Sequence, residues 1–366
     1  MTSAAMDDAA FDRMLVINAL GVIDNPNVTD PTAGADRQTL AYSSTAARVD
    51  ARAMRDAQAA RLSAVNVTLG HVAGSSDPFE ATVRDIASWD AHIRSHPHAL
   101  RKVLDGADLT AAHAAGQVGV IYGFQNTEML GRDASRVQVF GQLGVRIIQL
   151  TYNGRNAVGD GSTFPDDQGL SEFGSEVVTA LQVSKILVDL SHSSRKTCLD
   201  ALRLAQGPIV ISHSACRALA DHPRNKSDEE LRLLADGGGV IGIYSMPYLR
   251  LSGQPMAADL LAHLEHAINV CGEDHVGIGT DNGITLHDDP EALRSAHRAE
   301  VEMRRQLGIG APGESADVML GLPDLEGVSQ FRQLAAMLSA RGHSDARIAK
   351  ILGGNFQRVM TQVWAK

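Results

Sequence analysis

Eight short apolar runs, each ending in polar residues and followed by a helical pattern, constrain the fold of this chain most strongly. Near-continuous apolarity is typical of parallel strands buried on both faces, and the amphipathic stretches between the runs are typical of crossover helices. Ser227, with Glu230 three residues on, predicts the start of one such helix. Eight strands alternating with helices predict an α/β protein built as a (β/α)8 TIM barrel. The predicted strands are residues 14–20, 63–70, 118–126, 145–153, 185–192, 208–214, 239–246 and 275–283.

Two segments are longer than the minimal repeat requires. Residues 36–61 predict a helical insertion after the first strand, and residues 284–325 predict a long loop, rich in Gly and Pro, after the eighth. Loops that follow barrel strands lie on the catalytic face, so this loop either covers the pocket or is a surface excursion without a catalytic role. A chain of 366 residues suits one barrel with insertions, and we expect a single domain over residues 1–366.

The composition narrows the class of protein. The formal net charge of −10 provides no basic stripe to neutralise phosphates, so we expect no nucleic-acid partner. The three cysteines are scattered and outside any CxxC spacing, which disfavours a disulfide framework or a structural zinc knot. Neither a cationic leader nor a run of ~20 apolar residues is present, so we expect no membrane association and a cytoplasmic location.

Polar residues at the ends of the predicted strands are the candidates for chemistry, because these ends meet at one face of a barrel. His192 and His213 end neighbouring strands five and six, and Asp281 ends strand eight. A single histidine at a strand end is more often a hydrogen-bonded structural group than a ligand, but two in register favour a shared divalent cation. Imidazole and carboxylate ligands suit zinc, with an open position for a water whose pKa the metal lowers.

The other histidines considered lack such partners. We interpret them as solvated surface residues, and His71, just past the second strand, as structural rather than ligating. The surface set comprises His92, His96, His98, His263 and His297.

Five motifs resemble the membrane (renal) dipeptidase family of zinc peptidases, which are barrels of the amidohydrolase superfamily. They are DLSHSS, PIVISHSACRAL, DHPRNKSDEELRLLADGGGVIGIY, DHVGIGTDNG and LGGNFQRV, and the resemblance runs in order from about residue 118 to 365. It implies that His192 and His213 hold one of the family's two zinc ions and that Asp281 contacts the metals and handles the proton of the attacking water. It also implies that Arg224, followed by Asn225, binds the substrate carboxylate with its guanidinium fork.

The first strand departs from the family, whose motif there is Gly-His-Asn-Asp-hydrophobic-Pro and whose His and Asp hold the other zinc. The ungapped match is Gly21 to Pro26, in which the His is replaced by Val22 and Asp24 survives as a candidate ligand. A second alignment places residues 18–20 on the family's Asp-Gly-His, and both ligands are then lost.

Two further positions depart. Tyr122 stands where the family's Ile-Glu-Gly motif has the glutamate that bridges both metals, and a phenol cannot bridge them as a carboxylate does. Tyr152 stands where the family's Leu-Thr-His motif has the histidine that contacts the scissile carbonyl or oxyanion. We expect Tyr122 to contact substrate and Tyr152 to donate a hydrogen bond to the oxyanion. Alternatively, these polar groups satisfy one another around a vacant metal position.

Together these features predict a metal-dependent hydrolase that cleaves an amide or peptide bond in a small carboxylate-bearing substrate. One zinc ion per chain would be held by His192 and His213, with help from Asp281 or Asp24. The alternative is an inactive barrel that binds a small carboxylate or serves as a structural subunit. A third possibility is that Asp24 and Glu128 rebuild a second metal site. A homodimer is expected only by analogy with the family.

Overall fold

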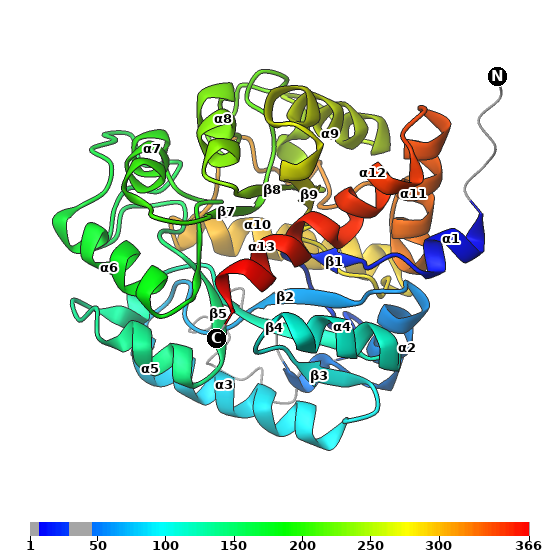
Figure 1. Ribbon diagram of the computed structural model, residues 1–366, viewed down its shortest axis with the longest axis horizontal. Helices are drawn as coiled ribbons and strands as arrows, with labels where there is room; N and C mark the ends of the chain where they lie inside the picture. The colour runs from blue at the N-terminus through cyan, green and yellow to red at the C-terminus, as the bar shows by residue number, and fades with distance from the viewer. Residues whose placement is uncertain (1–6, 29–45, 366) are drawn as a thin grey trace.

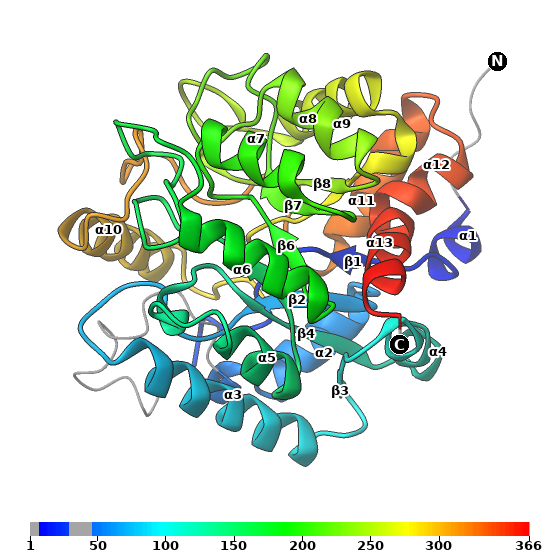
Figure 2. The same ribbon diagram turned by 60° about the vertical axis from the view of Figure 1, so that its left-hand side comes forward.

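The computed structural model describes residues 7–28 and 46–365, and it confirms the predicted barrel (Figures 1 and 2). Eight parallel strands follow the order β1-β2-β4-β5-β6-β7-β8-β9, and a short β3 pairs with β4 outside this path. The strands are β1 Ile17–Asn18, β2 Ala64–Thr68, β3 Leu100–Lys102, β4 Val118–Phe124, β5 Val145–Gln149, β6 Leu187–Asp189, β7 Val210–Ser214, β8 Val240–Ile243 and β9 Val276–Ile278.

Backbone hydrogen bonds between the first and last strands bring the sheet close to a full barrel. The Ala19 amide donates to the Ile278 carbonyl oxygen at 3.0 Å, and the Asp281 amide donates to the Leu20 carbonyl oxygen at 2.9 Å. The second bond also fixes the backbone of Asp281 against the end of β1.

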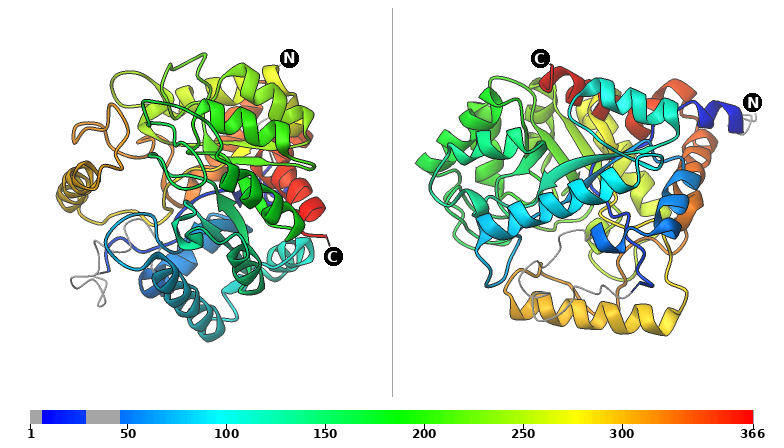
Figure 3. Two further views of the ribbon diagram at one scale, coloured as in Figure 1. Left: turned by 90° about the vertical axis from the view of Figure 1, so that its left-hand side faces the viewer. Right: turned by 90° about the horizontal axis from the view of Figure 1, so that it is seen from below.

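Helices surround the barrel (Figures 1 and 3). Across residues 7–28 and 46–365, none combines the length and apolarity needed to cross a bilayer. The α-helices are α1 Asp8–Asp12, α2 Ala51–Ala59, α3 Pro78–Ser95, α4 Gly106–Ala115, α5 Arg136–Gln142, α6 Glu172–Val183, α7 Arg195–Leu204, α8 Asp228–Asp236, α9 Ala257–Cys271, α10 Pro290–Gln306, α11 Gln330–Ala340, α12 Asp345–Ala349 and α13 Asn355–Val363.

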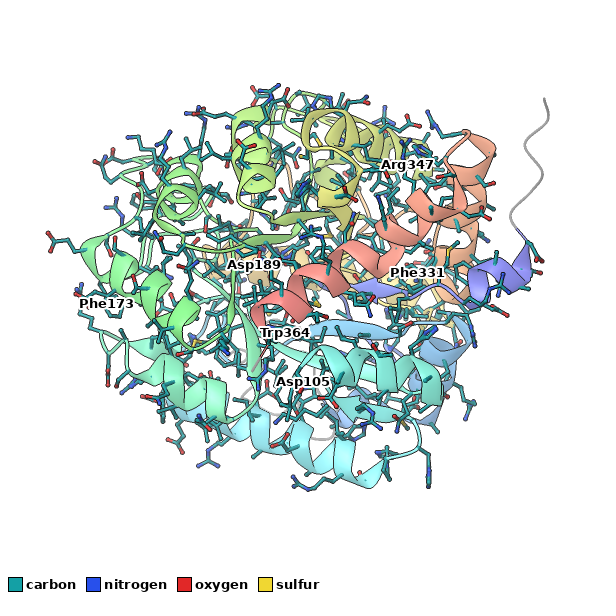
Figure 4. The ribbon with its side chains drawn as sticks, viewed as in Figure 1. Asp105, Phe173, Asp189, Phe331, Arg347 and Trp364 are labelled. Carbon is teal, nitrogen blue, oxygen red and sulfur yellow. The ribbon has the colours of Figure 1, made fainter. Side chains whose placement is uncertain are left out.

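The inside of the barrel is filled by apolar side chains and closed at one end by α13. Phe356, Val359 and Met360 of α13, together with Trp364, pack in one cluster with inward-facing residues of the strands (Figure 4). A Cβ atom on Gly277 of β9 would lie 2.7 Å from the Phe356 ring, so glycine is needed where the helix approaches the strand. Because α13 occupies the amino ends of the strands, the site must form at the other end.

Local sequence sets where the helices begin. Ser227 accepts a hydrogen bond from the Glu230 amide while the Glu230 carboxylate accepts one from the Ser227 amide, so the predicted capping box of α8 is confirmed. Asp289 caps α10, with Pro290 in the first turn.

Three features differ from the expectations. β3 was not predicted, because it has three residues, two of them charged, and pairs only with β4. In the 36–61 insertion, α2 covers residues 51–59, while residues 36–45 lie outside the described residues. The segment 284–325 is not simply a loop, since α10 fills its first half. α10 and α13 lie at opposite ends of the molecule (Figure 3).

Candidate active site

A cavity of about 350 Å³ lies where the strands end and the segment 284–325 folds back over them. Its floor comes from the carboxyl ends of strands, and its roof comes from α10 and the chain on either side of α10. The segment 284–325 therefore covers the pocket, which is one of the two alternatives expected from the sequence. The floor includes Leu20, Val22, Asp24, Thr68, Gln125, Tyr152, Asp281 and Asn282, and the roof includes Leu286, Leu293, His297, Glu300, Arg304, Met319, Leu320, Leu322 and Leu325.

The two predicted histidines face each other below this cavity. His192 follows β6 and His213 lies on β7, both are buried, and their Nε2 atoms are 3.0 Å apart. Burial, and then the positive charge of Arg224, hold the pKa of both imidazoles well below the ordinary value. Both rings are therefore neutral at physiological pH.

Hydrogen-bond partners assign the tautomer of His213. The Ser212 hydroxyl donates to the buried carboxylate of Asp189, so its oxygen accepts from the Nδ1–H group of His213 at 2.8 Å. Asp189, the last residue of β6, also accepts from the Ser191 hydroxyl and is labelled in Figure 4. The lone pair of His213 is consequently on Nε2.

The tautomer of His192 is fixed by Asn153. The Asn153 amide nitrogen donates to the Ile309 carbonyl oxygen at 2.7 Å, which orients its own oxygen toward Nδ1 of His192, also at 2.7 Å. Since an amide oxygen only accepts, Nδ1 of His192 carries the proton, and the lone pair of this ring is also on Nε2.

With these tautomers the two Nε2 atoms, 3.0 Å apart, are both acceptors, and a cation beside them would satisfy both lone pairs. Metal-binding histidines normally donate from the other ring nitrogen to an acceptor of this kind. The donor set therefore fits one zinc-like cation. In the described part of the chain, however, no group of three His, Cys, Asp or Glu side chains is placed to bind a metal. Any remaining positions would fall to solvent or substrate.

Tyr152 separates the histidine pair from the cavity. Its ring stacks on His192 with centroids 4.2 Å apart, and the residue also lines the cavity. Arg304 of α10 donates from Nη1 to the Tyr152 oxygen at 3.0 Å. Burial raises the pKa of Tyr152, against the charge of Arg304, so the phenol keeps its proton. Because Arg304 cannot accept that proton, the O–H group of Tyr152 can donate to a ligand.

Asp281 lines the cavity at the end of β9. Burial raises the pKa of its carboxyl group to about 6, although Arg224 and Arg304 act in the opposite direction. Its φ of +56° lies in the left-handed region, an uncommon conformation for a residue with a side chain. Such strain is often found at functional sites.

Arg224 is buried beside the histidines with one edge of its guanidinium unused. Its Nε and Nη2 atoms have no hydrogen-bond partner among the described residues, and its charge acts on His192, His213 and Asp281. These two nitrogens form the edge that grips a carboxylate with two parallel hydrogen bonds. Leaving them unpaired in the interior is costly, which favours an anionic ligand at this place.

Asn225 has a structural part rather than the predicted contact with substrate. Its amide donates to the carbonyl oxygens of Ala220 and Tyr248 at 2.9 Å, and its oxygen accepts from the Tyr244 hydroxyl. Because these bonds use the amide nitrogen and the oxygen of its side chain, Asn225 fixes the loop that carries Arg224.

Tyr122 is also not at the cavity, contrary to the prediction. Its hydroxyl donates to Asp90 of α3 at 2.8 Å, and Lys102 lies over its ring, so it points outward from the barrel. The residue of this strand end that lines the cavity is Gln125, whose amide donates to the Thr68 hydroxyl at 2.6 Å. The Ile-x-Gly pattern predicts the substrate contact at Tyr122 rather than at Gln125, because Tyr122 occupies its middle position.

The end of β1 contributes an apolar wall and one carboxylate. Leu20 and Val22, the positions to which the two alignments assign the lost histidine, both line the cavity. Asp24 lines it too, 3.9 Å from Arg48, but it does not join the histidines in a group of three. Glu128 is exposed and is not a cavity residue, so the structure does not bring it together with Asp24.

Arg304 and Glu314 were missed by the sequence analysis. The Arg304 fork donates to both carboxylate oxygens of Glu314 at 2.7 Å, and the Tyr248 hydroxyl donates to Glu314 at 2.6 Å. The pair anchors the chain after α10 to the site. The helical spacing of Leu293, His297 and Arg304 indicates one face of α10, but not what that face contacts.

Two histidines interpreted as solvated are buried. His263 accepts at Nδ1 from the Cys216 amide and donates from Nε2 to the Leu249 carbonyl oxygen, which is a structural role. His297 lines the cavity from α10. His71 is buried as well, and the cavity does not include it.

Comparisons with known proteins agree with the geometry. The family model described as membrane dipeptidase (peptidase family M19) matches residues 15–301 and 296–365. An uncharacterized protein in the pqqA 5′ region of Klebsiella pneumoniae is 30% identical over 304 residues, covering 79% of this chain and 98% of that protein. Dipeptidase verJ of Clonostachys rogersoniana is 27% identical over 289 residues, covering 78% of this chain and 66% of that protein.

A solved structure shares the fold over nearly its full length. An amidohydrolase from Pseudomonas aeruginosa is 30% identical, with a TM-score of 0.79, covering 98% of this chain and 99% of that chain. Since the family model matches most of the chain, this protein belongs to the membrane dipeptidase family, peptidase family M19, and is a dipeptidase-like hydrolase.

Proposed function

We propose that this protein hydrolyses an amide bond in a small carboxylate-bearing substrate with the help of one divalent cation, zinc being the best match. The observation that carries the proposal is the facing pair of Nε2 lone pairs on His192 and His213. When bound there, the cation would polarise a carbonyl group and lower the pKa of water.

The chain's own residues supply the remaining functions. The free edge of Arg224 holds the substrate carboxylate and thereby positions the amide. Asp281, with a pKa of about 6, is ionised at neutral pH and accepts a proton from the attacking water. The hydroxyl of Tyr152 donates to the carbonyl oxygen as negative charge develops on it.

One cation suffices for this chemistry, and the neighbouring residues favour one. Leu20 or Val22 stands where the family has a histidine, and the β4 end presents the neutral amide of Gln125 to the cavity. An alkyl group does not replace a histidine ligand, and a neutral amide does not replace a bridging carboxylate. The cytoplasmic location and the homodimer stay predictions from the sequence.

The test compares leucyl-alanine with leucyl-alanine amide, in which the carboxylate is capped, by following amine release from zinc-loaded protein. We expect hydrolysis of the free acid and a loss of about a hundredfold for the amide, a difference that Arg224→Ala abolishes. The control variant is Gln333→Ala, at an exposed position on the surface of α11. Asn156→Ala would not serve as a control, because the Asn156 side chain donates a hydrogen bond to the backbone at the end of β5.

Absence of hydrolysis for both compounds would contradict the proposal. If leucyl-alanine still bound with an affinity that Arg224→Ala reduces, the alternative of a catalytically inactive carboxylate-binding barrel would hold instead.

A further inference from the structure

The roof of the cavity has a chemical character that the proposed mechanism does not use. Leu293 of α10 and Met319, Leu320, Leu322 and Leu325 of the following chain all face the cavity, and Leu322 and Leu325 are also packed into the main core. The floor opposite carries the polar Gln125, Tyr152 and Asp281 beside the apolar end of β1, and the roof also has polar members on α10. A ligand here therefore meets a patch of hydrocarbon on the roof next to the hydrogen-bonding groups of the site.

The position of Arg224 decides which half of a substrate enters this space. Arg224 is not a cavity residue, whereas Tyr152 and Asp281 are, and its charge acts on both of them. On this basis the proposed binding mode puts the substrate carboxylate on the side of Tyr152 and Asp281 that faces away from the cavity. A substrate with its carboxylate on Arg224 and its scissile carbonyl at Asp281 directs its acyl half into the cavity.

The size of the cavity allows a substantial acyl group. A volume of about 350 Å³ is in the range of small-molecule sites. A glycyl or acetyl group would leave the apolar roof facing water, while a leucine-sized group would cover it. Burying a side chain of that size improves binding by about ten- to a hundredfold.

We propose that this enzyme is specific for α-amino acids that are acylated on their amino group by a bulky apolar acyl group. Leu293, Met319 and Leu320 recognise that acyl group. This inference rests on the proposed hydrolytic function. Two sources share the chemistry, namely dipeptides with a large apolar first residue and N-acyl amino acids with an alkyl acyl chain.

The test uses four probes that share the alanine leaving group: glycyl-alanine, leucyl-alanine, N-acetyl-alanine and N-hexanoyl-alanine. For each, kcat/KM is measured on zinc-loaded protein and Kd by calorimetry on the same protein. We expect the larger member of at least one pair to be favoured tenfold or more in kcat/KM. A preference confined to the dipeptides identifies peptides as the source, and one confined to the acyl compounds identifies N-acyl amino acids.

Variants connect this preference to the roof. Leu293→Asp places a charge on the partly buried roof side of α10 and should reduce the preference for the larger probe at least fivefold. Met319→Asp is the second variant if the first does not fold. Leu251→Asp is the matched control, because Leu251 is 69% exposed and is not a cavity residue.

Equal rates for large and small probes, or a preference that survives both roof variants, would overturn the inference while leaving the hydrolytic function intact. If none of the probes is cleaved, the hydrolytic function fails instead. The ratio of the Kd values then still decides whether the roof recognises an apolar group.

Discussion

Asn153 connects the histidine pair to the cover of the cavity. Its oxygen accepts from Nδ1 of His192, while its amide nitrogen donates to the backbone of Ile309 in the chain after α10, both at 2.7 Å. The orientation of the His192 ring is thus held by a residue that also fastens the roof. The site and its cover are one hydrogen-bonded unit.

Asn153→Ala should weaken zinc binding by about ten- to a hundredfold, because His192 loses the acceptor that fixes its tautomer. The measurement is competition for zinc with a chelator of known affinity. Asn153→Asp, which keeps an acceptor for Nδ1, should recover most of the affinity although it cannot donate to Ile309. An unchanged zinc affinity in Asn153→Ala would show that His192 is not a ligand oriented in this way.

Tyr152→Phe should lower kcat by about a hundredfold with little change in zinc content, since it removes one donor to the developing oxyanion and keeps the ring stacked on His192. Steady-state kinetics with leucyl-alanine, alongside metal analysis, check both parts. A normal kcat would remove Tyr152 from the reaction and leave it as a wall of the cavity.

Glu314→Gln should destabilise the protein by about 3 kcal/mol at pH 7, because Arg304 loses its buried counter-charge. Burial raises the pKa of Glu314, but the hydrogen bond and charge of Arg304 outweigh it, so the folded-state pKa is lowered from 4.5. The stabilisation is therefore complete above pH 4.5 and is lost as the pH falls through the lowered folded value.

Urea unfolding at pH 7 and in the acid range measures this difference, which should shrink with acidification. Glu302→Gln, at an exposed position on α10, is the control and should not change the midpoint. An equal loss for Glu314→Gln at both pH values would mean that packing, not the ion pair, is responsible.

The barrel could be predicted from the sequence because burial on both faces makes each parallel strand a recognisable apolar run. The predicted strands are longer than those in the structure, since apolar loop residues extend the same pattern. His192 and His213 could be predicted because strand ends converge at one face whatever the loops do.

The surroundings of the histidines could not be predicted in this way. Asn153 is 39 residues from His192 in the chain, and Arg304 is 152 residues from Tyr152, so neither contact leaves a local pattern. Tyr122 was assigned to the site on a three-residue motif, although side chains alternate along a strand and this one points to α3. Gln125, just beyond the last residue of β4, takes the position at the cavity.

Metal content tests the central claim most directly. Protein equilibrated with zinc and then desalted should contain about one zinc per chain, and both His192→Ala and His213→Ala should contain none. His98→Ala, at an exposed loop position, should behave as the unchanged protein. Two zinc ions per chain, or zinc retained in both histidine variants, would contradict the account.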